Sequence, residues 1–240
     1  DGWRIRLNGG AEGGRTFPES SVHTLPMQAS HILALLPSPP ALQRVRFALA
    51  ELHELGALTP EDTPTVLGAA FLKVPLDVPL ARFVVLGWSL GSPVEAAVLA
   101  GAMSLPRSCD VFRTPFNSQN RLSPNELRLL EEAIRTRREF DRGTHSEPIT
   151  VYNLFMEWMR LEGGRLGEAP RTAKWSWIVH GRIWSQFVLK VVDICLALRR
   201  LVPEDSQEAA DLDALLRRAR YGGSQPYEPP QEAPQWLAAL

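Results

Sequence analysis

The sequence predicts a mainly α-helical protein, and three observations support this fold class. Apolar residues recur every three or four positions through much of the chain, as they do on one side of an amphipathic helix. Two serine–proline pairs, Ser92-Pro93 and Ser123-Pro124, carry signals that start helices. The helices predicted in the first half are short and separated by glycine and proline, which end helices. Together these features indicate a protein built from packed helices.

The first forty residues predict little regular structure. Trp3 to Leu7 alternate bulky and basic side chains as a half-exposed strand does, and the glycine-rich run Asn8 to Gly14 then interrupts it. A helix is expected within Thr24 to Leu36, and Pro37-Ser38-Pro39-Pro40 ends it because proline cannot continue helical hydrogen bonds. The chain lacks an initiating methionine and a signal peptide, so we expect a piece of a longer protein.

Three short helices are predicted next. The first covers Ala41 to Leu55 and stops at Gly56. Its apolar side is formed by Leu42, Val45, Leu49 and Leu52. The second covers Thr65 to Leu72, and a turn containing prolines leads into the third, Leu80 to Trp88. Short helices joined by such turns suit a small helical domain.

The second half predicts longer helices with defined starts. One begins after Ser92, with the following proline in the first helical position, and its small side chains allow close helix packing. These small side chains are Val94, Ala97, Val98, Gly101 and Ala102. Another helix begins after Ser123, where Glu126 can complete a capping box. From Tyr221 onward Gly, Pro and Glu dominate, so we expect a loosely ordered tail with an apolar anchor at Trp236-Leu237.

The composition is that of an ordinary globular protein. The 240 residues are 45% hydrophobic with a net charge of -1, so any binding of nucleic acid must depend on a local basic patch. Cys109 and Cys195 are far apart, and we expect buried thiols rather than a disulfide or a zinc site. Arg82, Glu95 and Asp193 interrupt the longest apolar runs, so no membrane span is predicted.

No catalytic or metal site is predicted in this segment. A phosphate-binding loop needs the pattern G-x-x-x-x-G-K-[ST], and the glycine-rich run Gly9 to Arg15 has neither the lysine nor a following helix. The histidines share no short ligand spacing and have no nucleophile or carboxylate pair beside them, so we expect surface or core roles. They are His23, His31, His53, His145 and His180.

Several ordered motifs resemble one protein family. Leu52-His53-Glu54-Leu55-Gly56-Ala57-Leu58 falls in register with L-x-x-L-G-A-L, and Leu67 to Arg82 falls in register with L-G-x-x-x-A-x-x-P-L-D-P-x-L-A-K. Leu90-Gly91-Ser92 follows where the pattern has L-G-C, and Ile149 to Trp158 resembles L-T-L-L-N-V-Y-N-x-W, with Asn153 and Trp158 on matching positions. These are motifs of DEAH-box and related RNA helicases, in the region C-terminal to their two motor domains. The resemblance covers roughly residues 3 to 200 and is strongest from Leu52 to Met103.

The resemblance implies a domain organisation. Residues 1–38 would include a short strand from the end of the second RecA-like motor domain and a linker. Residues 39–88 would form a winged helix, and 89–201 the helical bundle called the ratchet domain. Residues 202–240 would be a C-terminal helix and the loosely ordered tail.

It also implies a function, which is the RNA channel and domain coupling of an ATP-dependent helicase in RNA processing or ribonucleoprotein remodelling. ATP and magnesium would bind in the parent's motor domains and not in this segment. The expected partners are single-stranded RNA, those motor domains, and an activator or ribonucleoprotein complex, in an intracellular compartment that the resemblance does not specify. One alternative is a catalytically silent scaffold derived from a helicase. A winged-helix DNA binder is disfavoured because no helix in 39–88 has a dense basic face.

The candidate RNA-binding residues lie mainly in 171–190. On a helix from Arg171 to Leu198, with about 100° per residue, cations and one tryptophan collect opposite an apolar side. The apolar side consists of Trp177, His180, Trp184, Phe187, Val188, Val191, Ile194, Cys195 and Leu198. Cations neutralise phosphates and an aromatic ring stacks a base. The alternative is a solvated face with chance basic residues. The candidate set, which includes one residue taken from the resemblance in 149–158, is Arg171, Lys174, Trp175, Arg182, Lys190 and Asn153.

Two departures weaken the likeness in this region. Gly181 stands where the family pattern has Asn, and Gln186 where it has Arg, while Lys190 keeps the basic position. A second basic cluster contains Arg135, Arg137, Arg138 and Arg142. Acidic residues alternate with this cluster, so we expect ion pairs that stabilise its helix.

Overall fold

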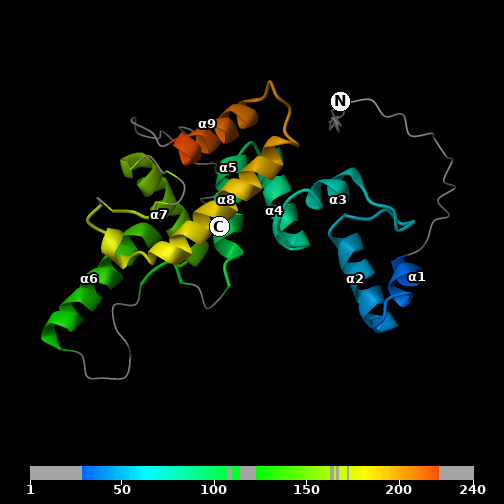
Figure 1. Cartoon of the computed structure of the whole chain (residues 1–240), viewed down its shortest axis with the longest axis horizontal. Helices are drawn as coiled ribbons and strands as arrows, with labels where there is room; N and C mark the ends of the chain where they lie inside the picture. Colours follow the sequence, from blue (N-terminus) through cyan, green and yellow to red (C-terminus); the bar gives the residue numbers. More distant parts are fainter. Residues whose placement is uncertain are drawn as a thin grey trace. The chain divides into compact units, whose positions relative to one another are not determined.

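The computed structural model describes residues 29–106, 110–113, 123–162, 165, 168–171 and 173–221. The chain forms two compact units, Asp1–Leu72 and Lys73–Leu240 (Figure 1). Helices dominate the described residues, as predicted, and two isolated antiparallel β-bridges, Leu58 with Pro64 and Phe112 with Val179, are the β pairings among them. The predicted strand at Trp3 to Leu7 and the predicted tail after Tyr221 lie outside the described residues.

The first unit contains three helices, α1 (Ala29–Ala34), α2 (Leu42–Glu54) and α3 (Val66–Phe71). The stop predicted at Gly56 is confirmed, because Gly56 adopts a φ of 71°. Its N–H donates to the His53 carbonyl, and the N–H of Ala57 donates to the Leu52 carbonyl. This is the Schellman arrangement, which satisfies carbonyls left open at a helix end.

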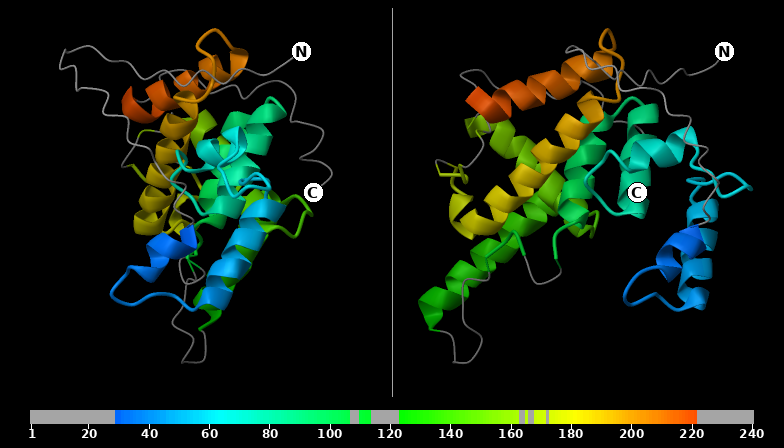
Figure 2. Two further views of the ribbon diagram at one scale, coloured as in Figure 1. Left: turned by 90° about the vertical axis from the view of Figure 1, so that its right-hand side faces the viewer. Right: turned by 45° about the vertical axis from the view of Figure 1, so that its right-hand side comes forward.

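The second unit contains α4 (Val78–Ser89), α5 (Pro93–Met103), α6 (Pro124–Asp141), α7 (Glu147–Glu162), η1 (Ser176–Ile178), α8 (Gly181–Arg199) and α9 (Gln207–Tyr221). Helix α5 packs against α4, α7, α8 and α9, so it is the central helix of this unit (Figure 2). Helix α6 packs mainly on α7 and extends away from the other helices of the unit (Figures 1 and 2).

The helix-start signals predicted from the sequence are confirmed in part. Ser123 and Glu126 form the predicted capping box at the start of α6. Pro93 occupies the first position of α5, and Ser92 is its N-cap residue, but the Ser92 hydroxyl makes no capping hydrogen bond. The small side chains of α5 do allow close contact, since a Cβ added to Gly101 would lie 2.8 Å from Val191 Cγ2 on α8.

The core of the second unit is aromatic. Phe155 and Trp158 on α7 meet Trp184 and Phe187 on α8, and all four side chains are fully buried. The Trp158 and Trp184 rings pack edge to face, with centroids 5.3 Å apart. The prediction that Trp184 belongs to the core is confirmed. So is the prediction of a buried thiol at Cys195, whereas Cys109 lies outside the described residues.

The predicted continuous helix from Arg171 to Leu198 is wrong in its first part. Residues 176–178 form the short 3-10 turn η1, and α8 begins only at Gly181. The break is fixed by a pairing with a distant segment, because Arg113 N–H donates to the Ile178 carbonyl and His180 N–H donates to the Val111 carbonyl. Trp177 therefore lies off the apolar side of α8 and is half-buried rather than in the core.

The winged-helix and ratchet arrangements remain predictions. The predicted helices of the range 39–88 are present as α2, α3 and α4, and that range continues across the boundary between the two units. Among the described residues, no helix combines the length and the hydrophobicity that a membrane span requires.

Candidate functional site

The segment that leads into α8 positions most of the candidate residues. Arg171 and Lys174 are exposed and precede η1, and Trp175 is its N-cap residue. The turn is held by its own backbone, since Ser176 N–H donates to the Ala173 carbonyl and Ile178 N–H donates to the Trp175 carbonyl. The two cations are thus presented by a short hydrogen-bonded turn, and not by the helix face that the sequence predicted.

Trp175 is half-buried against the end of α6. Its ring meets the Phe140 ring edge to face, with centroids 5.4 Å apart and an interplanar angle of 81°. Such pairs stabilise beyond the area that they bury. Phe140 was not predicted as a site residue, and the available signal was weak: it is an aromatic residue in the last turn of an amphipathic helix.

Helix α8 carries the remaining cations. Arg182 is exposed in its first turn, and Lys190 is half-buried. Eight residues separate them, which corresponds to roughly 12 Å along the helix axis. The Nζ of Lys190 donates to the Pro75 carbonyl over 2.5 Å, so this ammonium joins α8 to the segment before α4. Gln186 is exposed between the two cations, at the position where the family pattern has arginine.

Asn153 occupies a different environment from the other candidates. It lies on α7 with only 8% of its surface exposed, and its Nδ2 donates to the Phe140 carbonyl over 2.7 Å. A buried amide engaged with the backbone has little surface to offer a phosphate or a base. Its role as a direct RNA contact stays a prediction, and the structure links it to Trp175 through Phe140.

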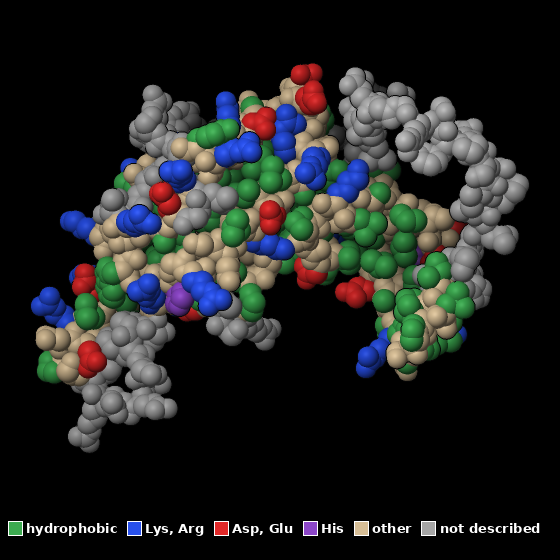
Figure 3. Space-filling view, in the orientation of Figure 1, with side chains coloured by type: hydrophobic (Ala, Val, Ile, Leu, Met, Phe, Trp, Pro, Cys, Tyr) green, Lys and Arg blue, Asp and Glu red, His purple; other side chains and the backbone are tan. Residues whose placement is uncertain are grey.

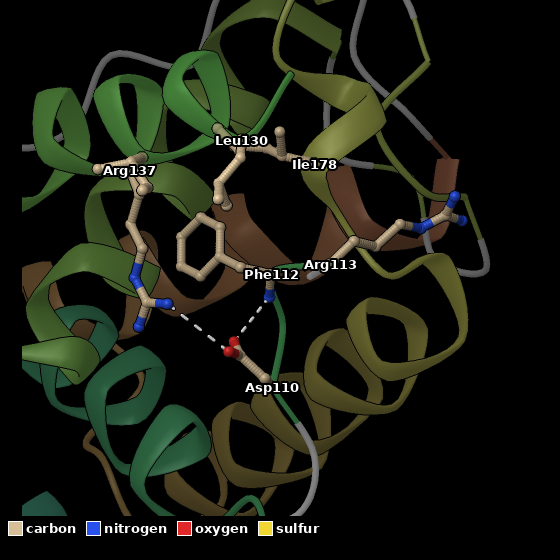
Figure 4. A pocket seen from close by; sticks show the side chains of 8 residues that line it. Asp110, Phe112, Arg113, Leu130, Arg137 and Ile178 are labelled. Atoms are coloured by element: carbon tan, nitrogen blue, oxygen red, sulfur yellow. Dashed lines mark hydrogen bonds and ion pairs between the residues drawn. The ribbon is translucent and has the colours of Figure 1, made fainter. Parts of the chain in front are cut away.

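The second basic cluster behaves differently from the prediction. Arg137 reaches out of α6 to Asp110 and to Glu147, with N–O distances of 3.6 and 3.2 Å, and its guanidinium lies 4.9 Å from the centre of the Phe112 ring. Arg137, Asp110 and Phe112 border a hollow of about 120 Å³ (Figure 4). The prediction of pairs within the helix is wrong for Arg137, which instead ties α6 to α7 and to the segment 110–113.

Among the described residues, each histidine side chain is exposed or paired with a carboxylate. His53 bonds Asp62 with 2.6 Å between Nε2 and Oδ1, His180 is exposed, and His23 and the side chain of His31 lie outside the described part. No group of three potential ligands that could hold a metal occurs within the described ranges. The pKa of Cys195 is raised to about 12 by burial and by the nearby Glu95, so this thiol is unreactive at neutral pH.

The exposed charges of the second unit are mixed. Figure 3 shows Lys and Arg side chains over much of the face in view, with acidic and apolar side chains between them. This agrees with the near-neutral net charge of -1. A basic surface for a polyanion would therefore have to be a small one.

Comparison with known proteins identifies relatives among RNA helicases. No family model matches the chain. It is 32% identical over 153 residues to the probable ATP-dependent RNA helicase spindle-E of Anopheles gambiae, covering 60% of this chain and 9% of that protein. It is 27% identical over 158 residues to the probable ATP-dependent RNA helicase DHX34 of Mus musculus, and 29% identical over 155 residues to that of Homo sapiens. Both of these matches cover 64% of this chain and 12% of the relative, so the chain spans about a tenth of the length of these proteins.

Proposed function

We propose that this chain, which is related to the C-terminal region of DEAH-type RNA helicases, forms part of the surface along which such a helicase holds single-stranded RNA. The observation that supports this most directly is the group of exposed cations Arg171, Lys174 and Arg182 in the segment around Trp175. We call these four residues the cationic turn. ATP hydrolysis would belong to motor domains elsewhere in the whole protein.

The chemistry of the cationic turn suits a nucleic-acid backbone. Guanidinium and ammonium groups neutralise phosphates whatever the base sequence, and an indole can stack any base because every base has a π face. Arg182 also lies in the first turn of α8, where the partial positive charge of the helix N-terminus favours a bound anion. The cationic turn would therefore contact the phosphate backbone of the RNA and have little preference for base sequence. An enzyme that translocates along RNA needs such sequence-independent contacts.

A scaffold role is the second candidate. Gly181 and Gln186 stand where the family pattern has Asn and Arg, so two polar groups that the resemblance implies for RNA are missing. A protein of this kind would keep the helical bundle for contacts within a ribonucleoprotein complex without gripping RNA by this surface. The two candidates differ in whether the cationic turn contributes to RNA affinity.

Salt dependence of RNA binding separates them. We would measure the affinity of the whole chain for a single-stranded oligonucleotide over a range of salt concentrations, for the natural sequence and for Arg171→Ala/Lys174→Ala/Arg182→Ala. Each phosphate contact to a single strand contributes about -0.7 to the slope of log K against log salt, so three lost contacts should flatten it by about two.

A matched control removes three exposed cations elsewhere. Arg128→Ala/Arg135→Ala/Arg138→Ala takes the same charge from α6, where all three side chains are exposed. The proposal expects the slope of this variant to stay close to that of the natural chain. If both triple variants flatten the slope equally, or if neither does, the cationic turn is only a solvated surface and the scaffold role is favoured.

A further inference from the structure

We infer that Asn153 is a positioning residue for Trp175 and that it acts through Phe140. This inference rests on the proposed function, because it concerns how the aromatic member of the cationic turn is held. It assigns a role to a buried polar side chain that is not itself a member of the cationic turn. The three residues come from different segments, α7, the segment before α8, and α6.

The first link is a hydrogen bond at a helix end. The last four carbonyls of an α-helix have no partner within the helix. Phe140 is the second-to-last residue of α6, and its carbonyl accepts the hydrogen bond from Asn153 Nδ2 over 2.7 Å. Asn153 is 8% exposed and the bond is partly buried, so it is partly shielded from water and joins the last turn of α6 to α7.

The second link is a ring contact. The same residue, Phe140, places its ring edge to face with Trp175 at 5.4 Å. The position of this ring depends on where the last turn of α6 lies, which Asn153 determines. The indole of Trp175 is consequently held by its own turn on the backbone side and by Phe140 on the ring side. A ring held in one orientation loses less conformational freedom when a base stacks on it.

Another buried contact at the same joint provides a control. Thr150 on α7 donates to the Ser146 carbonyl and to Asp141 Oδ1, at 2.8 and 3.3 Å. It therefore also stabilises the junction of α6 and α7, and no ring contact connects it to Trp175 among the described residues. If Asn153 matters only for the stability of the junction, Asn153→Ala and Thr150→Ala should have the same consequences.

Fluorine NMR of the whole chain labelled with fluorotryptophan reads the position of the indole without RNA. The chain has seven tryptophans, and the Trp175→Phe variant assigns the resonance of Trp175. We expect Asn153→Ala to shift or broaden the Trp175 resonance and to leave that of the buried Trp184 in place. Thr150→Ala should lower the unfolding midpoint and leave both resonances unchanged.

RNA affinity then tests the coupling. Trp175→Ala should weaken binding about tenfold if one base stacks on it, and Asn153→Ala should weaken it by a similar factor. The double variant should be no weaker than Trp175→Ala alone, because the two changes remove the same interaction. Phe140→Leu is a second route to the same result, since it removes the ring and keeps the carbonyl that Asn153 bonds.

The outcomes separate the two proposals. If Trp175→Ala leaves RNA affinity unchanged, the stacking role in the proposed function is wrong, while a shifted Trp175 resonance in Asn153→Ala would still support the positioning. If Trp175→Ala weakens binding but Asn153→Ala and Phe140→Leu change neither the resonance nor the affinity, the positioning role is overturned and the proposed function stands. Fully additive losses in the double variant would also overturn it.

Discussion

Gly87 on α4 and Ala96 on α5 lie at a close crossing of the two helices. A Cβ added to Gly87 would lie 2.3 Å from the Ala96 Cβ, a separation that real Cβ atoms do not show. Both residues are buried, and Ala96 is completely so. The absence of a side chain at Gly87 is therefore what lets the central helix α5 approach α4 closely. Small residues elsewhere on α5 serve the same purpose toward α8.

Gly87→Ala should destabilise the chain by about 1 to 3 kcal/mol, because the added methyl group forces the two helices apart. Chemical unfolding measured by circular dichroism gives this free energy. The double variant Gly87→Ala/Ala96→Gly moves the methyl group to the other helix and should recover most of the loss. If the single variant is as stable as the natural chain, the two helices do not meet as closely as we describe.

Trp184→Ala should lower the free energy of unfolding by about 3 to 5 kcal/mol, since it leaves a cavity among Phe155, Trp158 and Phe187. Trp177→Ala should cost clearly less, because Trp177 is half-buried. The two unfolding midpoints compared in one buffer check this difference. Equal losses would contradict the different burial of the two tryptophans.

Glu95 predicts a pH dependence of stability. It is 4% exposed on α5, and burial, with a further contribution from the negative charge of Asp211 on α9, raises its pKa above the ordinary value of 4.5. The unfolded chain therefore loses the Glu95 proton at lower pH than the folded chain does. The contribution of Glu95 to the free energy of unfolding falls as the pH rises from about 4.5 through the pKa that Glu95 has in the folded chain. This contribution does not recover at higher pH.

Glu95→Gln removes this ionisation with little change of shape. Relative to the natural chain, the variant should gain stability as the pH rises from 4 to 8, with the difference levelling off above the folded pKa of Glu95. Urea unfolding of both proteins across this range measures the difference. Other carboxyls titrate in both proteins, so their contributions cancel in the difference. Glu157, whose pKa is lowered by the hydrogen bond from Arg160, is one of them. A difference that is constant with pH would show that Glu95 titrates normally.

The sequence predicted those parts of the fold that depend on neighbouring residues. The end of α2 at Gly56 and the capping box of Ser123 and Glu126 each involve hydrogen bonds between residues at most five apart. The buried side of α8 follows from helical periodicity, and its predicted members from Trp184 to Leu198 are buried. Such features can be read from a short window because the interactions that cause them lie within it.

Features set by distant residues could not be predicted in this way. The break before α8 depends on hydrogen bonds from Arg113 to Ile178 and from His180 to Val111, over more than sixty residues of chain. Arg137 likewise pairs with Asp110 and Glu147 and not with its helical neighbours. Within the candidate site, the exposure of Arg171, Lys174 and Arg182 agrees with the predicted polar side, while the buried position of Asn153 required the packing of α6 on α7.

Gln186→Arg should strengthen RNA binding if the cationic turn binds phosphates. Arg182, Gln186 and Lys190 follow one another at intervals of four residues along α8, so they form one row on its surface. Arginine at the exposed position 186 restores the residue of the family pattern and completes a row of three cations. One additional phosphate contact should make the slope of log K against log salt steeper by about 0.7.

The same binding measurement on Asn125→Arg provides the comparison. Asn125 is exposed near the start of α6, so this variant adds the same charge away from α8. A general effect of net charge would raise RNA affinity in both variants equally, whereas a contact beside the cationic turn raises it only in Gln186→Arg. Combined with Arg171→Ala/Lys174→Ala/Arg182→Ala, the added arginine should recover about one third of the lost slope. No gain from Gln186→Arg, in a variant that unfolds at the same temperature as the natural chain, would mean that RNA does not pass along this face of α8.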